Sequence, residues 1–141
     1  MIAVALLAVL LRLAIPSLRD FLATQRVKTV AYETVAALNL ARTEAIKRSV
    51  SVTLTATTSG TSQSWTLSAP GGGSTLQVWT IPTGTKVTAG FSNVIFNSDG
   101  RASASTSITV CNDPATARIK QRVVTLDASG RPNLKLGNAC A

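Results

Sequence analysis

The start of the chain is apolar on all sides. Between Met1 and Ile15 the only charged residue is Arg12. A helix needs about 20 apolar residues to cross a bilayer, so this stretch of about 15 is short for a complete span. It suits either the hydrophobic part of a signal peptide or part of a membrane helix. No basic region precedes it and no A-x-A cleavage pattern follows it; instead the helical pattern continues.

The segment from Ser17 to Arg48 is predicted to be an amphipathic helix, because it contains no Gly or Pro and its apolar positions follow the helical period. Pro16, which removes one backbone donor, is expected to kink the helix between its two parts. One helix over both parts would be about 70 Å long, so its front part is expected to project from the molecule. The apolar stripe consists of Val27, Ala31, Val35, Leu38, Ala41 and Ala45, extended at its ends by Leu18, Leu22 and Ile46.

After Ser49 the apolar period changes from helical to alternating, which is typical of half-buried strands. Short strands rich in Ser and Thr and joined by tight turns favour an antiparallel sheet. Trp65, Trp79, Phe91 and Phe96 are the large side chains expected in its core. The expected strands are Val50–Ala56, Trp65–Ala69, Leu76–Ile81, Lys86–Val87, Asn93–Asn97, Thr106–Cys111, Ile119–Leu126 and a short stretch at Asn133–Leu136.

These patterns predict an α+β fold in which a long N-terminal helix packs on a small antiparallel β-sheet or sandwich head. We expect three parts: residues 1–16 as the hydrophobic part of the helix, 17–48 as its amphipathic part and 49–141 as the head.

The composition disfavours an enzyme. The chain has 141 residues, no histidine and six carboxylates. It therefore lacks the usual general base, the commonest metal ligand and any Ser-His-Asp or Cys-His nucleophile arrangement. No P-loop and no GxGxxG motif is present, so we expect no catalytic residue, no metal site and no cofactor.

The net charge of +8 is concentrated at the two ends of the chain. Residues 1–50 carry seven basic and three acidic side chains, and residues 101–141 carry six and two. Residues 51–100 carry only Lys86 and Asp99. A neutral middle between two basic ends indicates either two separate electrostatic roles or a contribution to solubility alone.

Two cysteines, Cys111 and Cys140, lie in the C-terminal part. Two are too few for a zinc site made of cysteine alone, and no histidine is present to complete one. The pair is typical of one disulfide in an exported domain, and the alternative is two unrelated buried thiols.

Four segments resemble the GspH/FimT family of type IV pilin-like proteins, which comprises minor pseudopilins of type II secretion and minor type IV pilins. Residues 14–22 (AIPSLRDFL) resemble the end of a prepilin-type hydrophobic segment, and residues 36–48 (AALNLARTEAIKR) resemble the helix signature of the family. Residues 96–101 (FNSDGR) and 129–132 (SGRP) resemble its strand-turn motifs. The resemblance covers most of the chain.

The resemblance implies a structural, initiating or tip subunit of a type IV pilus or a type II secretion pseudopilus. Its helix would lie in the inner membrane as a single pass before assembly and then pack against the helices of other pilins or pseudopilins. Its head would face the periplasm or the cell surface. Members of the family begin with a basic leader, a prepilin peptidase site and an early glutamate. The match therefore implies that this leader and about six mature residues precede Met1 in the complete protein, which would lengthen the apolar segment to about 20 residues.

The alternative function is DNA uptake during natural transformation, because some FimT-like minor pilins resemble DNA receptors with a Gly-Arg-x-Arg motif. Gly130-Arg131-Pro132 matches its first part, and Asn133 replaces its second arginine. Arg118, Lys120 and Arg122 alternate, so on a strand they would share one face, and Arg131 and Lys135 lie in or beside the loop between the two cysteines. Together these five residues are predicted to form a stripe that binds phosphates. Such binding would be non-specific. The candidate residues are Arg118, Lys120, Arg122, Arg131 and Lys135.

Overall fold

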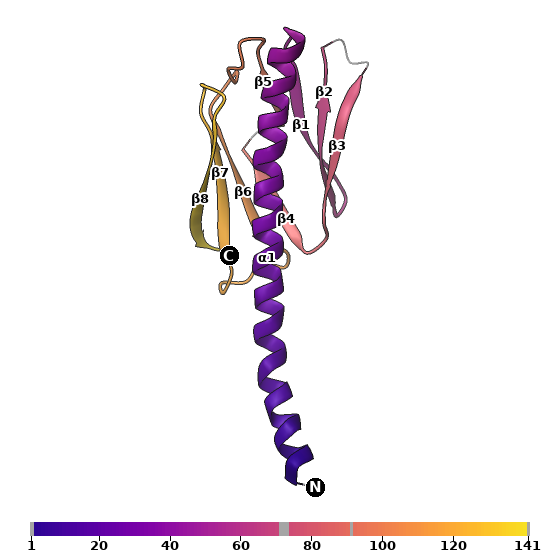
Figure 1. Cartoon of the computed structure of the whole chain (residues 1–141), viewed down its shortest axis with the longest axis vertical. Coiled ribbons are helices and arrows are strands. Elements are labelled where there is room, and N and C mark those ends of the chain that lie inside the picture. The colour runs from indigo at the N-terminus through magenta and orange to yellow at the C-terminus, as the bar shows by residue number, and fades with distance from the viewer. Residues whose placement is uncertain (1, 71–73, 91, 141) are drawn as a thin grey trace.

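A computed structural model shows one long helix packed against a head of two four-stranded antiparallel sheets, which confirms the expected fold class (Figure 1). It describes residues 2–70, 74–90 and 92–140, and for residues 2–16 it describes the backbone only. The elements are α1 (Ile2–Arg48), β1 (Val52–Ser59), β2 (Ser62–Ser68), β3 (Thr75–Ile81), β4 (Thr85–Ala89), β5 (Asn93–Phe96), β6 (Thr106–Asn112), β7 (Lys120–Leu126) and β8 (Pro132–Ala139).

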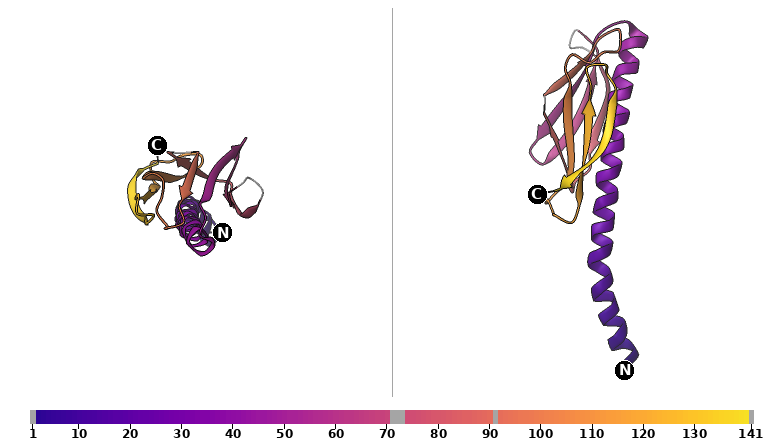
Figure 2. Two further views of the ribbon diagram at one scale, coloured as in Figure 1. Left: turned by 90° about the horizontal axis from the view of Figure 1, so that it is seen from above. Right: turned by 90° about the vertical axis from the view of Figure 1, so that its left-hand side faces the viewer.

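The C-terminal half of α1 forms one wall of the core. The predicted stripe is confirmed at Val27, Ala31, Leu38, Ala41 and Ala45, which are at most 1% exposed, and Val35 is half-buried. The stripe faces strands of both sheets, which lie on either side of the helix (Figures 1 and 2).

The expected extensions of the stripe are wrong as core positions. Leu18, Leu22 and Ile46 are about half exposed, at 57%, 47% and 48%. At about 100° per residue, Leu18 and Leu22 lie about 180° and 140° around the helix from Val27, so they face away from the head. They belong to a second apolar face of α1, on the side opposite the core.

The helix ends at a left-handed residue, Ser49, with φ of 56°. The Val50 amide donates to the Ala45 carbonyl at 3.3 Å, the six-to-one hydrogen bond of a Schellman ending. One turn earlier, Arg48 Nε donates to Glu44 Oε2 at 2.6 Å. This hydrogen bond holds the pKa of Glu44 below its usual value.

The N-terminal part of α1 extends well beyond the head as a stem (Figure 1). The helix is continuous through Pro16, whose side chain lies outside the described residues, so the kink at this position stays a prediction. Within the part of the chain whose side chains are described, no helix contains a stretch apolar and long enough to span a membrane.

The two sheets have the strand orders β3-β2-β1-β5 and β4-β6-β7-β8. Their inner faces and α1 enclose one hydrophobic core. Trp65 and Phe96 are buried there as expected, at 3% and 0% exposure. Trp79 is only half-buried, because it lies on the edge strand β3 directly across from Trp65. Phe91 lies outside the described residues.

The last strand is twice as long as expected. β8 covers Pro132–Ala139, whereas the alternating pattern supported only Asn133–Leu136. It pairs with β7 from Leu126↔Pro132 to Lys120↔Ala139, with a register shift between Lys120 and Arg122. The irregular register interrupts the alternation, so the sequence pattern marks only the middle of the strand.

The free edge of β4 is covered by a side chain of the other sheet. Gln63 on β2 donates from Nε2 to the Val87 carbonyl and accepts from the Val87 amide at Oε1, both at 2.8 Å. An amide side chain thereby takes the place of a neighbouring strand and joins the two sheets.

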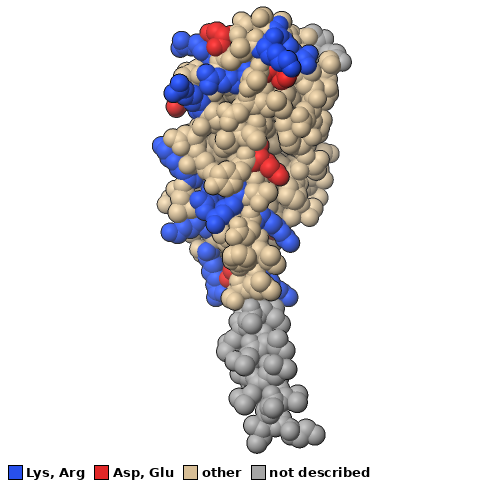
Figure 3. Space-filling view, in the orientation of Figure 1, with Lys and Arg blue, Asp and Glu red and all other residues tan. Residues whose placement is uncertain are grey.

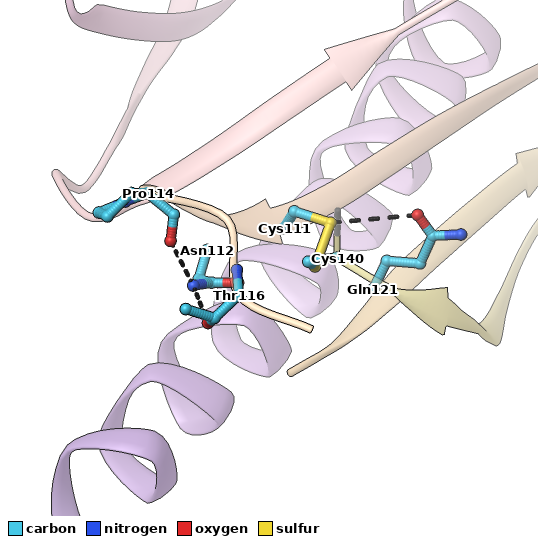
Figure 4. The surroundings of a disulfide bond; sticks show 6 residues. All are labelled: Cys111, Asn112, Pro114, Thr116, Gln121 and Cys140. Atoms are coloured by element: carbon cyan, nitrogen blue, oxygen red, sulfur yellow. Dashed lines mark hydrogen bonds between the residues drawn. A yellow bond between two sulfur atoms is a disulfide. The ribbon is translucent and has the colours of Figure 1, made fainter. Parts of the chain in front are cut away.

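Cys111 and Cys140 form a disulfide with a Cα–Cα distance of 5.7 Å, which confirms the expected pairing (Figure 4). It ties the end of β6 to the residue after β8, and the Cys140 amide also donates to the Ile119 carbonyl at 2.8 Å. Beside it, Asn112 Nδ2 donates to the Pro114 carbonyl and to Thr116 Oγ1, which shapes the loop that leads to β7.

The upper end of the head is joined to α1 through two glycine turns. Gly100 and Gly130 have φ of 77° and 75°. The Ala102 amide donates to the Ala128 carbonyl at 3.2 Å, which joins the two turns. A Cβ on Gly100 would lie 2.7 Å from Ile46 Cδ1 and 3.1 Å from Arg42 Nε, and one on Gly130 would overlap the Gly100 carbonyl oxygen. Both turns therefore pack directly on the last turns of α1.

This contact brings together three of the segments that carry the family resemblance. Residues 96–101 and 129–132 form the two turns, and residues 36–48 supply Arg42 and Ile46. Arg42 Nε is buried and has no hydrogen-bond partner among the described residues. The three motifs thus mark one packing contact between helix and head.

Replacing both cysteines by alanine is expected to lower the free energy of unfolding by about 3–4 kcal/mol, because the disulfide closes a loop of about 30 residues in the unfolded chain. Urea unfolding of the variant and of the oxidised parent measures this difference. An equal midpoint for the two proteins would contradict the role given to the disulfide.

Gly130→Ala is expected to destabilise the head more than Gly60→Ala. Gly60 also has a positive φ, of 61°, but no atom lies within 4 Å of its Cβ position. Both variants incur about 1–2 kcal/mol for the left-handed backbone. Only Gly130→Ala adds about 1–3 kcal/mol of overpacking, and chemical unfolding measures both. Equal losses would show that the turns do not pack as described.

Candidate functional site

The stem exposes large apolar side chains just outside the head. Leu18 and Phe21 are each 57% exposed and Leu22 is 47% exposed. Together they form an apolar surface on α1 that none of the described residues covers. A cluster of exposed apolar side chains is typical of surfaces that contact another protein or a membrane.

The base of the head is where α1 leaves it, and two loops contact the helix there. Arg118, which precedes β7, places Nη1 3.4 Å from Asp20 Oδ2 on α1. In the turn before β4, a Cβ on Gly84 would lie 3.4 Å from Arg26 Nη1 and 3.9 Å from the Asp113 carbonyl oxygen. The base of the head thus lies beside α1 between residues 20 and 26.

The structure distributes the five predicted DNA-binding residues over several places. Arg118 is exposed at the base of the head beside Asp20, and Arg131 is exposed at the opposite end beside Gly130. Asp20 and Arg42, their respective neighbours on α1, are about 33 Å apart along the helix axis. Lys120 is exposed at the start of β7.

Arg122 and Lys135 lie on opposite faces of the β7–β8 pair, so the prediction of one basic stripe formed by all five residues is wrong. Arg122 is directly across from Val110, which is fully buried on the inner face, whereas Lys135 is directly across from Val123. Directly paired residues share a face, and neighbouring residues alternate between faces. DNA binding by these residues stays a prediction.

The contacts at the base could not be identified from sequence spacing. Asp20 and Arg118 are 98 positions apart, and Arg118 lies in none of the segments that resemble the family. Arg26 lies beside the turn at Gly84 because the tertiary packing of the two sheets places that turn next to α1. The related signal in the sequence is the excess of basic residues in its first and last parts, which does not show which side chains meet.

The hollows of the head offer little catalytic chemistry. One of 760 Å³ lies beside the disulfide, where Lys86 and Asp113 are its charged lining residues. Another, of 320 Å³, opens between the sheets and contains no charged side chain. Among the residues whose side chains are described, no three His, Cys, Asp or Glu are placed to hold a metal ion.

Comparison with solved structures identifies relatives of this fold. The type IV minor pilin FimU of Pseudomonas aeruginosa superimposes with a TM-score of 0.68 at 18% identity, over 83% of this chain and 96% of FimU. The minor pseudopilin EpsH from the type 2 secretion system of Vibrio cholerae superimposes with a TM-score of 0.58 at 13% identity, over 80% of this chain and 97% of EpsH. At these identities the likeness shows the fold.

The family is shown by the sequence itself. No curated protein matches the chain closely enough to count as a relative. The pattern of the family described as "Type II transport protein GspH" matches residues 31–130, which is well over half of the chain. This range includes the helix and turn segments that meet at Gly100 and Gly130. The chain therefore belongs to the GspH family of pilin-like proteins.

Proposed function

We propose that this protein is a minor pilin or minor pseudopilin that assembles with other pilin subunits through its N-terminal helix, in a type IV pilus or a type II secretion pseudopilus. The observation that carries the proposal is the stem, a helix that leaves the head with Leu18, Phe21 and Leu22 exposed. Packing against neighbouring helices would remove these side chains from water.

Before assembly, the apolar beginning of the chain would anchor the protein in the inner membrane, with the head on the periplasmic side. The lack of polar interruptions other than Arg12 before Pro16 supports this location. The disulfide supports an oxidising compartment for the head. The role we propose is structural and not catalytic, in keeping with the absence of histidine from the chain.

Phe21→Asp in combination with Leu22→Asp is expected to reduce incorporation into filaments at least about tenfold, because burial of one such side chain contributes about 1.5–3 kcal/mol. The measurement is complementation of a deletion strain. Pili sheared from the cells are quantified for the pilus, and exported substrate is quantified for the secretion system. The two readouts also distinguish between the machines.

Val78→Asp is the matched control, since Val78 is a 53% exposed apolar residue on β3 of the head. It is expected to complement fully. Equal incorporation of the stem variant and the parent would contradict assembly through α1, provided that both proteins accumulate to the same level.

A role in DNA uptake is the second candidate, and the exposure of Arg118, Lys120, Arg131 and Lys135 supports it. In that case, Arg131→Ala combined with Lys135→Ala weakens duplex DNA binding several-fold at low salt. The slope of the logarithm of the binding constant against the logarithm of the salt concentration falls by the amount expected for about two phosphate contacts. A gel-shift titration of the full chain in detergent measures this. Absent binding, or binding that the double variant leaves unchanged, would remove the second candidate.

A further inference from the structure

Basic side chains gather where the helix leaves the head. Figure 3 shows Lys and Arg on both sides of the stem at this level, directly above the part of the helix that is drawn grey. Five of the six are exposed, and the sixth, Lys28, is half-buried. We call this group the basal collar; it consists of Arg19, Arg26, Lys28, Lys86, Arg118 and Lys120.

Contacts between distant segments bring the collar together. Arg118 meets Asp20, the neighbour of Arg19, and Arg26 lies against the turn at Gly84, two residues before Lys86. Lys86 is paired with Cys111 on β6, so it lies next to the same loop that carries Arg118. Three separate parts of the sequence thus place cations near residues 19–28 of α1, a stretch of about 14 Å along its axis.

The collar holds a larger excess of positive charge than the opposite end of the head. Its six basic residues are accompanied by Asp20 and Asp113, of which Asp20 is already paired with Arg118. At the upper end, five basic residues are accompanied by three acidic ones. Two of these residues, Glu44 and Arg48, form an ion pair at 2.6 Å. These upper residues are Arg42, Lys47, Arg48, Arg101 and Arg131, with Glu44, Asp99 and Asp127.

Apolar side chains lie beside the lowest cation of the collar, Arg19, and before it in the sequence. Leu18, Phe21 and Leu22 are exposed at this level, and residues 1–16 are apolar except for Arg12. Leu18 and Arg26 are about 12 Å apart along the helix axis. Charged and apolar residues are interleaved within this interval, since Arg19 and Asp20 precede Phe21 and Leu22. The change from the apolar residues 1–16 to the cations of the collar therefore takes place over a distance similar to that between hydrocarbon and headgroups at a membrane surface.

We propose that the basal collar binds anionic phospholipid headgroups at the membrane surface from which the stem emerges, and so holds the head against the bilayer before assembly. This inference rests on the membrane anchoring proposed above and adds a partner for the head. The collar fits a lipid surface better than DNA. Two of the five residues predicted to bind DNA lie away from the collar: Lys135 is on the outer face of β8, and Arg131 is at the opposite end of the head. Exposed, separated cations at a charged surface act as point charges, so salt weakens the attraction.

The test is amide hydrogen exchange of the full chain in nanodiscs of neutral phosphatidylcholine and in nanodiscs with 30% phosphatidylglycerol. At low salt, anionic lipid is expected to slow exchange at least about threefold in residues 83–86 and 113–120, which form the base of the head, by electrostatic attraction to the collar. Residues 97–101 and 127–131, at the upper end, are expected to exchange equally in both discs. In 0.5 M salt the difference is expected to disappear, because the screening length falls to about 4 Å.

Two triple variants with the same loss of charge make the test specific. Arg19→Gln with Arg118→Gln and Lys120→Gln is expected to abolish the difference between the two discs. Lys47→Gln with Arg101→Gln and Arg131→Gln, which removes three exposed cations at the upper end, is expected to keep it. Each variant is compared with itself in the two lipids, so a change in its own stability does not affect the result.

The outcomes separate this proposal from the one on which it rests. Equal exchange of the parent in both discs, or the same loss in both triple variants, overturns the collar and leaves the anchoring intact. A chain that enters neither disc overturns both. Inorganic phosphate or duplex DNA that slows the same residues in neutral discs as strongly as anionic lipid overturns the lipid assignment in favour of free phosphate or nucleic acid.

Discussion

The structure depends on burial of one face of α1 against both sheets. Val27, Ala31, Leu38, Ala41 and Ala45 fill the space between the sheets at the centre of the core. Neither sheet has another element to cover this face in the described part of the chain. Because the same helix continues as the stem, the position of the stem relative to the head is set by core packing and not by a linker.

Two further contacts join the head to α1, one at each end of the head. At the upper end, Gly100 and Gly130 bring their backbones against Ile46 and Arg42. At the base, Arg118 meets Asp20. These contacts are about 33 Å apart along the helix axis. The glycine turns are buried, whereas both side chains of the Arg118–Asp20 pair are exposed, at 78% and 40%, so the pair contributes little. Because α1 is continuous and its buried face fills the core, the head and the stem form one packed unit.

The sequence pattern was sufficient for the elements that follow a regular period. The stripe from Val27 to Ala45 predicts the buried face of α1, and the strands from β1 to β7 lie close to their expected positions. β8 was underestimated because its register shifts at Lys120 and Arg122. Leu18 and Leu22 lie about 180° and 140° around the helix from Val27, at about 100° per residue, so they face away from the head although they are spaced like helix residues.

The candidate site was less accessible to sequence reasoning. Alternation of Arg118, Lys120 and Arg122 suggests one basic face, but Arg118 precedes the strand, and the pairing of Arg122 with Val110 directs it to the inner side. The motifs at 96–101 and 129–132 resemble the family, but the sequence alone does not show their physical role. In the structure both turns pack against Arg42 on α1. Long-range contacts of this kind depend on how the sheets close, which no local pattern records.

Continuity of the stem with the core helix is the central claim, and a distance between two spin labels tests it most directly. Labels are attached to Ser17→Cys and Asn39→Cys, both exposed on α1, in the full chain with its disulfide intact. One unbroken helix predicts a single narrow distance distribution near 33 Å, at about 1.5 Å per residue. A broad distribution, or a maximum far below this value, would show that the stem bends back or moves independently of the head, and would contradict the account.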